Sequence, residues 1–298
     1  MNLLWVLFTI IAAAGQTARN AMQRELTGRL GPVGATHVRF LFGFPFAILF
    51  ATCVWFINGQ PTPNLNPGFW AWIITGALAQ IIATALMLMT MEQRSFVVTT
   101  AYLKTEPFFV AVGGFFLLGD RLTPGMMLAI LIAIIGVVLI SLRPGAEKNL
   151  TEAKPALMGL AAGAVFGLSA IGYRGAILAL DTPLYVFSSS FALAIGLTFQ
   201  AAVLTLWLLA TEPKTLTRIA HMWKPSLFAG FMGSFASAFW FLAFSLATAA
   251  SVRTLGLIDV LFAQGVSHLI FKQKTTWREA AGIALLVAGA ILIVRAHG

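Results

Sequence analysis

Charged residues are scarce in this chain of 298 residues: Asp, Glu, Lys and Arg make up 10% of it, against 59% hydrophobic residues and a mean hydropathy of +0.89. A soluble domain usually carries about 25% charge, so the composition excludes a soluble globule. The single cysteine, Cys53, lies in an apolar run and cannot form an internal disulfide. No basic stretch precedes the apolar run that begins at Leu3, so we expect no cleavable signal peptide.

The sequence also lacks the motifs of membrane enzymes and of ATP-driven pumps. Its four histidines and one cysteine form no HExxH motif, cysteine pair or histidine cluster, so we predict neither enzyme activity nor a cofactor. No phosphate-binding loop is present, which argues against ATP-driven pumping by this chain. Lys and Arg exceed Asp and Glu by 19 to 10. In a membrane chain cytoplasmic loops normally hold such an excess, so we expect no nucleic-acid partner.

Long apolar runs occupy most of the chain. A helix needs about 20 apolar residues to cross the hydrocarbon core of a bilayer. The run from Met126 to Leu142 is apolar on every side, as in a lipid-facing or fully buried helix, whereas barrel strands would alternate. We therefore predict an all-α integral membrane protein with ten transmembrane helices, near residues 3–18, 33–57, 68–90, 95–118, 123–142, 156–179, 184–210, 225–247, 250–271 and 276–295.

Basic residues gather in alternate connections between these segments. The connections after the odd-numbered segments hold 13 Lys and Arg residues, including Arg19, Arg24 and Arg29 after the first segment. The opposite side, with both termini, holds only Arg121 and Arg295. By the positive-inside rule, the odd connections are cytoplasmic and both termini face outward from a bacterial inner (plasma) membrane.

The two halves of the chain resemble each other. A shift of 153 residues lays Gly289 on Gly136 and Asp259 on Glu106, and a shift of 151 lays Pro183 on Pro32. Chance matching among Leu, Ile and Gly is the competing explanation. The matches predict two five-helix repeats, 1–147 and 154–298. Because five is odd, such repeats enter the membrane in opposite senses, and inverted repeats are the architecture of many secondary transporters.

Short motifs carry a family resemblance. Gly119 to Pro124 (GDRLTP), followed by GVVLIS from Gly136, resembles the end of each repeat in the drug/metabolite transporter (DMT) superfamily of EamA type. Leu30 to Gly34 (LGPVG) resembles the start of helix 2 in its YddG-type aromatic amino-acid exporters. The resemblance covers the whole chain. It implies a central cavity between helices 1–4 and 6–9, and export of amino acids or related small metabolites by alternating access.

The mode of coupling has two interpretations. Related four-helix multidrug exporters carry a proton-binding Glu in helix 1, eight residues before a basic residue, and the corresponding pair here resembles Gln16 and Arg24. Gln does not titrate, so a passive uniporter or channel-like facilitator of the same solutes is the alternative to a coupled transporter. In either case we expect a small-molecule substrate, a lipid bilayer around the chain, and function as a monomer.

Charged side chains inside the apolar runs are candidates for function, because a charge at the bilayer centre costs about 2.5–3.5 kcal/mol and is usually kept only beside a cavity or partner. Lys104 and Glu106, two residues apart, point to different faces, so we expect each to pair with Arg253 or Asp259 of the other repeat. Structural packing and substrate or proton binding are alternative roles. The candidates for intramembrane charge and gating are His37, Arg39, Lys104, Glu106, Pro107, Arg253 and Asp259, and His268 is a further candidate.

Simpler interpretations compete for some of these residues. His37, Arg39 and His268 lie near expected helix ends, where capping or snorkelling to the interface would explain them. Pro107 is predicted to kink its helix, with or without acting as a hinge.

Polar and aromatic side chains on the helices around the expected cavity are candidates for substrate contact, since small-molecule pockets combine a few polar groups with apolar walls. Interfacial anchoring of aromatic residues and bonding of Ser or Thr to their own helix are the alternatives. Gly159, Gly163 and Gly167 recur every four residues and predict close packing of a neighbouring helix. The substrate candidates are Gln16, Asn20, Gln80, Thr84, Tyr102, Ser169, Tyr173, Ser237, Trp240 and Phe241.

Overall fold

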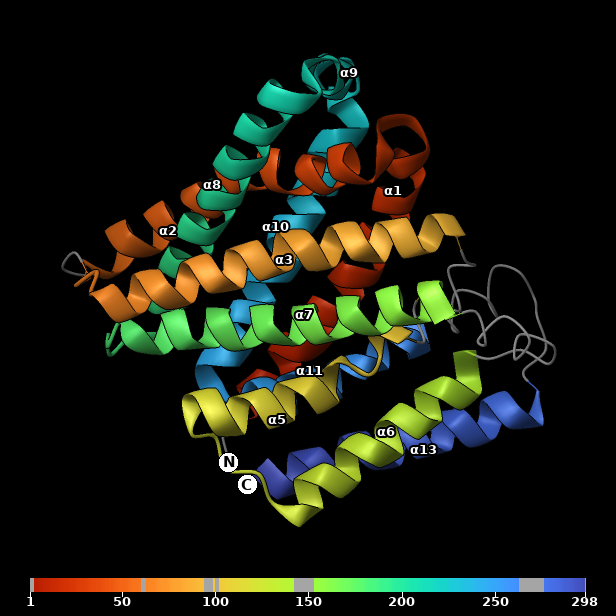
Figure 1. Cartoon of the computed structure of the whole chain (residues 1–298). Helices are drawn as coiled ribbons and strands as arrows, with labels where there is room; N and C mark the ends of the chain where they lie inside the picture. Colours follow the sequence, from red (N-terminus) through yellow and green to blue (C-terminus); the bar gives the residue numbers. More distant parts are fainter. Residues whose placement is uncertain are drawn as a thin grey trace.

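The computed structural model describes residues 3–59, 63–93, 99, 102–141, 153–262 and 276–297. Within these ranges all regular structure is helical, which confirms the all-α class (Figure 1). The elements are α1 (Leu4–Leu41), α2 (Phe44–Asn58), α3 (Pro67–Gln93), α5 (Glu106–Leu118), α6 (Pro124–Ser141), α7 (Ala153–Ala179), α8 (Tyr185–Thr211), α9 (Pro213–His221), α10 (Trp223–Leu246), α11 (Ala249–Leu255), the 3-10 helix η2 (Gly256–Ile258) and α13 (Trp277–His297).

Several helices are long and apolar enough to cross a membrane. Large apolar side chains cover their outer faces: Phe56 and Ile57 at the end of α2 are 83% and 82% exposed, and Phe116 of α5 is 76% exposed. On long apolar helices, exposed side chains of this kind are typical of a surface that faces lipid. Two shorter apolar helices, Glu106–Leu118 and Pro124–Ile140, accompany six spans of sufficient length: Glu25–Asn58, Pro67–Gln93, Lys154–Ala179, Tyr185–Thr211, Trp223–Leu246 and Trp277–Ala296. The chain is therefore built as a multi-pass membrane protein.

The connection expected after the first segment is wrong, because α1 continues through it. Its one non-helical residue is Gly31, at φ 70° and ψ 171°. Glycine adopts positive φ without a steric penalty, and Pro32 suits the first position of the helix that follows, so the two residues together turn the chain. Arg19 consequently lies inside the helix and is 4% exposed. It therefore no longer counts among the loop cations from which the membrane orientation is predicted.

The helices of the two halves pair in a symmetrical pattern. α1 packs against α10 and α7 packs against α3, while α6 packs on α13 and α2 on α8 (Figure 1). Under the repeat shift α1 corresponds to α7 and α10 to α3, so the first pair becomes the second. α6 corresponds to α13 and α2 to part of α8, so each of these two pairs joins equivalent helices. A two-fold axis between two related repeats produces this pattern, so the two-repeat architecture is present in the packing as well as in the sequence.

The contact between α6 and α13 shows the symmetry at single residues. A Cβ atom added at Gly136 would lie 2.6 Å from the backbone N of Leu286, and one added at Gly289 would lie 2.8 Å from the backbone N of Ala133. The 153-residue shift superposes Gly136 on Gly289 and Ala133 on Leu286, so these are the same contact made from either repeat. Early residues of one helix meet late residues of the other, so the two helices run antiparallel (Figure 1).

Replacing Gly136 or Gly289 by Ala should therefore destabilise the protein. The new Cβ would meet backbone atoms that cannot move aside, and overpacking of this kind costs about 1–3 kcal/mol. Thermal unfolding of the purified variants in detergent measures the loss. Gly28→Ala is the control, because nothing lies within 4 Å of its added Cβ. A Gly136→Ala variant as stable as Gly28→Ala would show that α6 and α13 do not cross at this residue.

Candidate functional site

Two buried ion pairs join the halves of the chain. Lys104 Nζ lies 2.5 Å from Asp259 Oδ1, and Arg253 Nε lies 2.6 Å from Glu106 Oε1. The four side chains are between 8% and 15% exposed. The expectation that Lys104 and Glu106 pair with the other repeat, and not with each other, is confirmed. Each acid thus binds its cation across the interface between the repeats.

Each of these acids follows an interruption in its helix. α5 begins at Glu106, directly after a turn at residues 104–105, and Asp259 follows the 3-10 helix η2. Pro107 lies in the first turn of α5, where its missing N–H costs nothing. It lies at the start of α5, directly after the break at residues 104–105, so the distortion predicted there is present as a break in the helix. Its role as a hinge stays a prediction.

Glycines bring α7 close to the segment that carries Lys104 and Glu106. A Cβ at Gly159 would lie 2.6 Å from the ring of Tyr102, one at Gly163 3.2 Å from Thr105 Oγ1, and one at Gly167 3.2 Å from Val110 Cγ2. The predicted close packing along these glycines is confirmed. It holds the interrupted helix against α7.

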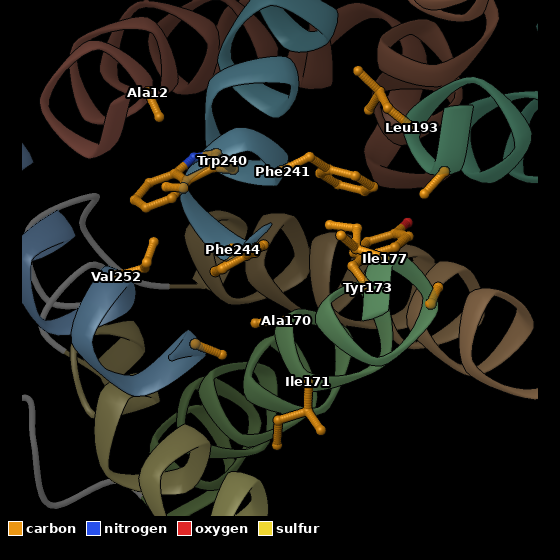
Figure 2. Close-up of a cluster of buried hydrophobic side chains, with 14 of the residues drawn as sticks. Ala12, Ala170, Ile171, Tyr173, Ile177, Leu193, Trp240, Phe241, Phe244 and Val252 are labelled. Atoms are coloured by element: carbon orange, nitrogen blue, oxygen red, sulfur yellow. The ribbon is translucent and has the colours of Figure 1, made fainter. Parts of the chain in front are cut away.

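Aromatic rings of α10 cover Arg253. Its guanidinium carbon lies 4.6 Å from the ring centre of Trp240 and 5.7 Å from that of Phe244. Trp240 Nε1 donates a hydrogen bond of 3.1 Å to Gln16 Oε1 in α1. In Figure 2, Trp240 points toward Ala12 of α1 and Val252 of α11. Two rings thus cover the Arg253 end of the ion pair with Glu106, and one of them, Trp240, also binds α1.

Two further arginines lie in the interior, on the two arms of α1. Arg19 is 4% exposed and Arg39 is 2% exposed. Arg19 donates from Nε and one terminal nitrogen to Asn20 Oδ1, at 3.2 and 2.7 Å, and Arg39 donates to Ser237 Oγ at 3.4 Å. Both side chains pass Gly233 of α10, where an added Cβ would lie 3.1 Å from Arg39 Cγ and 3.6 Å from Arg19 Cδ. We call Arg19 and Arg39 the arginine pair.

A cluster of amides and a tyrosine links α3, α7 and α8. Tyr173 donates its hydroxyl proton to Gln80 Oε1 at 3.0 Å, and Gln200 Nε2 donates to the same oxygen at 3.0 Å and to Ala77 O at 3.0 Å. The ring of Tyr173 lies 4.6 Å from that of Phe241. Figure 2 shows the two side chains next to each other. The cluster thus presents neutral polar groups beside aromatic rings.

The structure joins most of the predicted substrate residues in these contacts: Gln16, Asn20, Gln80, Tyr173, Ser237, Trp240 and Phe241. Three others lie apart from them. Thr84 donates to Gln80 O of its own helix, the ring of Tyr102 faces Gly159, and Ser169 is buried in α7. Substrate binding by any of these residues stays a prediction.

Snorkelling is the wrong interpretation of His37 and Arg39, which are 0% and 2% exposed. His37 lies in the middle of the helical segment that begins at Pro32, and its Nε2 is 3.1 Å from Thr205 Oγ1 of α8. Arg39 lies in the last turn of α1, as expected, but its side chain packs against Gly233 of α10. His268 lies outside the described residues.

Sequence reasoning missed Arg174. One terminal nitrogen of this residue lies 3.1 Å from Asp120 Oδ1, and the other donates to Phe244 O and Ala247 O at 2.8 and 2.6 Å. The group ties the turn before α6 to α7 and to the end of α10. Its signal was a lone charge inside the apolar run 156–179, the same signal that selected Lys104.

A surface cavity of about 400 Å³ lies between the bend of α1 and α9 and contains none of the predicted substrate residues. Its lining is basic: Arg29, Lys214, Thr217, Arg218, His221 and Met222. Over the part of the chain that the structure describes, no group of three or more His, Cys, Asp or Glu residues could hold a metal ion.

Comparisons with known proteins found a matching family and a solved structure of similar fold. A profile of the EamA-like transporter family matches the chain twice, over residues 3–142 and 153–295. A solved structure described only as the crystal structure of a protein is similar at a TM-score of 0.72 and 16% identity, covering 98% of this chain and 97% of its own. At that identity the likeness shows the fold alone. No curated protein matches the chain.

The ion pair between Lys104 and Asp259 should be visible in a double-mutant experiment. Lys104→Met or Asp259→Leu alone leaves one buried charge without its partner, which costs about 3–5 kcal/mol, whereas the double variant removes both charges. We expect both single variants to unfold at a lower temperature than the double variant. Lys214→Met, at an exposed side chain of α9, is the control. A double variant no more stable than the weaker single variant would contradict the pairing.

Proposed function

This chain belongs to the EamA-like transporter family, and on that premise we propose that it is a secondary transporter that exports amino acids or related small metabolites across the bacterial inner membrane by alternating access. The expected resemblance to the DMT superfamily of EamA type is confirmed by the family match, and the YddG-type subtype stays a prediction. Proteins of this family are transporters, which agrees with the absence of enzyme motifs in the sequence.

The proposed topology is ten transmembrane helices in two inverted repeats, 1–147 and 154–298. The antiparallel, two-fold contact of Gly136 and Gly289 supports the inversion, since oppositely inserted repeats would bring equivalent helices together in opposite directions. The distribution of Lys and Arg, now without Arg19, supports cytoplasmic odd connections and outward termini. A duplicated chain of this kind would provide both halves of a transporter, so we propose that it functions as a monomer.

The observation that carries the proposal is the charge at the interface between the repeats. Transporters with inverted repeats bind substrates and coupling ions near the bilayer midplane, where interrupted helices leave polar groups available. Glu106 and Asp259 occupy equivalent positions after such interruptions, and each holds a cation of the opposite repeat. Two repeats that rock against each other would strain these pairs directly, so we propose that the pairs form part of the gate.

A passive facilitator is the second candidate. Gln16 stands where the multidrug exporters have a titratable Glu, and its side-chain oxygen accepts a hydrogen bond from Trp240. An amide in this position cannot carry a proton through the cycle. If transport is coupled to protons, Glu106 and Asp259 are the acids that we propose for the coupling.

Counterflow into proteoliposomes tests both candidates. We expect a labelled amino acid or related small metabolite to enter vesicles preloaded with the unlabelled compound, and we expect a pH gradient to drive net uptake. Glu106→Gln and Asp259→Asn should remove the response to the gradient and retain counterflow, because exchange needs no proton. Glu25→Gln, on the exposed side of α1, is the matched control.

The other possible results of the counterflow experiment distinguish the two candidates or contradict them. Exchange that ignores the gradient in the unaltered protein would favour the facilitator. An unchanged pH dependence in folded Glu106→Gln and Asp259→Asn variants would remove the proposed proton role. Failure to exchange any amino acid or metabolite would contradict both candidates.

A further inference from the structure

The buried cations of the central region outnumber the buried acids. Lys104 and Arg253 are matched by Asp259 and Glu106. All acidic residues of the chain except Glu147 and Glu152 lie among the described residues. None of the described acids forms an ion pair with Arg19 or Arg39. The arginine pair therefore leaves two positive charges uncompensated within the described structure.

Two uncompensated guanidinium groups are an unfavourable arrangement in a low-dielectric interior. A buried charge without a partner is costly, and charged residues kept within transmembrane segments are typically functional. Arg39 and Arg253 repel Arg19, and Arg253 also repels Arg39, while Glu106 and Asp259, which are already bound to other cations, offset part of the repulsion on Arg19. Packing alone does not require this cluster, since apolar side chains would fill the same space without the electrostatic cost.

The hydrogen-bonding capacity of the pair is also largely unused. A guanidinium carries five N–H donors in a fork that fits carboxylate and phosphate. Arg39 makes one long hydrogen bond, of 3.4 Å to Ser237 Oγ, and its buried Nε has no hydrogen-bond partner. Arg19 donates to a single oxygen, Asn20 Oδ1. Donors and positive charge thus converge where only neutral acceptors are present.

We propose that the arginine pair is the anion-binding part of the substrate site, and that the transported substrate is a small organic acid with a net negative charge. This inference rests on the proposed function and narrows its substrate class. The oxyanion group of the substrate lies between the guanidinium forks of Arg19 and Arg39 and accepts from both. Its negative charge offsets their positive charge and reduces the repulsion between them.

The surroundings of the pair select against a zwitterion. The ammonium group of an ordinary amino acid would need a carboxylate, but Glu106 and Asp259 are already bound to Arg253 and Lys104. The remaining polar groups are neutral amides and hydroxyls such as Gln80 and Ser237. Organic acids without an ammonium group therefore fit best, and an acidic amino acid, whose net charge is negative, fits better than a neutral one.

Matched solutes that differ in charge test the proposal. Binding to the purified protein is measured by thermal shift, and transport by counterflow, with succinate against succinamide, glutamate against glutamine, and glycerol 3-phosphate against glycerol. We expect at least one anion to stabilise the protein and to exchange about tenfold better than its neutral or zwitterionic partner, a preference of about 1.4 kcal/mol. Comparison of succinate with glycerol 3-phosphate distinguishes a carboxylate from a phosphate ligand.

Variants of the pair supply the second measurement. Arg39→Gln and Arg19→Gln should lose the preference for the anion about tenfold, and Arg39→Lys should retain part of it, because lysine keeps the charge but not the fork. Without substrate, Arg39→Gln should unfold at the same or a higher temperature than the unaltered protein, since an uncompensated charge is removed. Arg29→Gln, at the exposed bend of the same helix, is the control and should change neither property.

The possible failures separate this inference from the proposed function. Exchange of neutral or zwitterionic solutes as fast as anions would overturn the anion assignment and leave the transporter intact. A lower unfolding temperature of substrate-free Arg39→Gln would also overturn it, because the arginine would then be a structural partner. Absence of both exchange and thermal shift with every solute would contradict the inference and the proposed function together.

Discussion

The architecture depends on the cost of placing charge in a low-dielectric interior. A chain with so few charged residues nevertheless keeps Lys104, Glu106, Arg253 and Asp259 in its centre, and each is held by a residue of the other half. The interruptions before Glu106 and Asp259 place these charges between the repeats. The glycines of α7 and the rings of α10 then pack closely around these charges. The interface between the repeats is thus defined by electrostatic matching as much as by shape.

The frame is symmetric, but the charges on it are not. Glu106 and Asp259 are equivalent under the 153-residue shift, whereas the two cations are not. Lys104 lies two residues before Glu106 in the sequence, and Arg253 lies six residues before Asp259. Arg39 corresponds to Ser190 under the shift of 151 residues that superposes Pro183 on Pro32. The two-fold symmetry therefore accounts for the packing of the helices, while the excess positive charge belongs to the first repeat alone. In our account the symmetric part permits alternating access and the asymmetric part recognises the substrate.

Sequence patterns predicted the features that depend on short-range regularity. The apolar runs gave the helical class, the repeat matches located Gly136 and Gly289 at equivalent contacts, and the spacing of Lys104 and Glu106 excluded a pair between them. Features that depend on three-dimensional burial were missed. The polar stretch after residue 18 resembles a loop, but in α1 Arg19 faces the protein interior. Arg39 lies in the last turn of α1, as expected, but it is buried and does not reach the membrane interface. The local sequence around a charged residue does not indicate which other helix will pack over it.

Infrared difference spectroscopy of the purified protein tests the central claim, that the acids between the repeats are ionised and bound to cations. Spectra of the unaltered protein are compared with those of Glu106→Gln and Asp259→Asn at neutral pH. The account predicts that each substitution removes bands of an ionised carboxylate. Loss of a carbonyl band from a protonated carboxyl group in either variant would show that the acid is neutral. The electrostatic matching of the repeats would then be wrong.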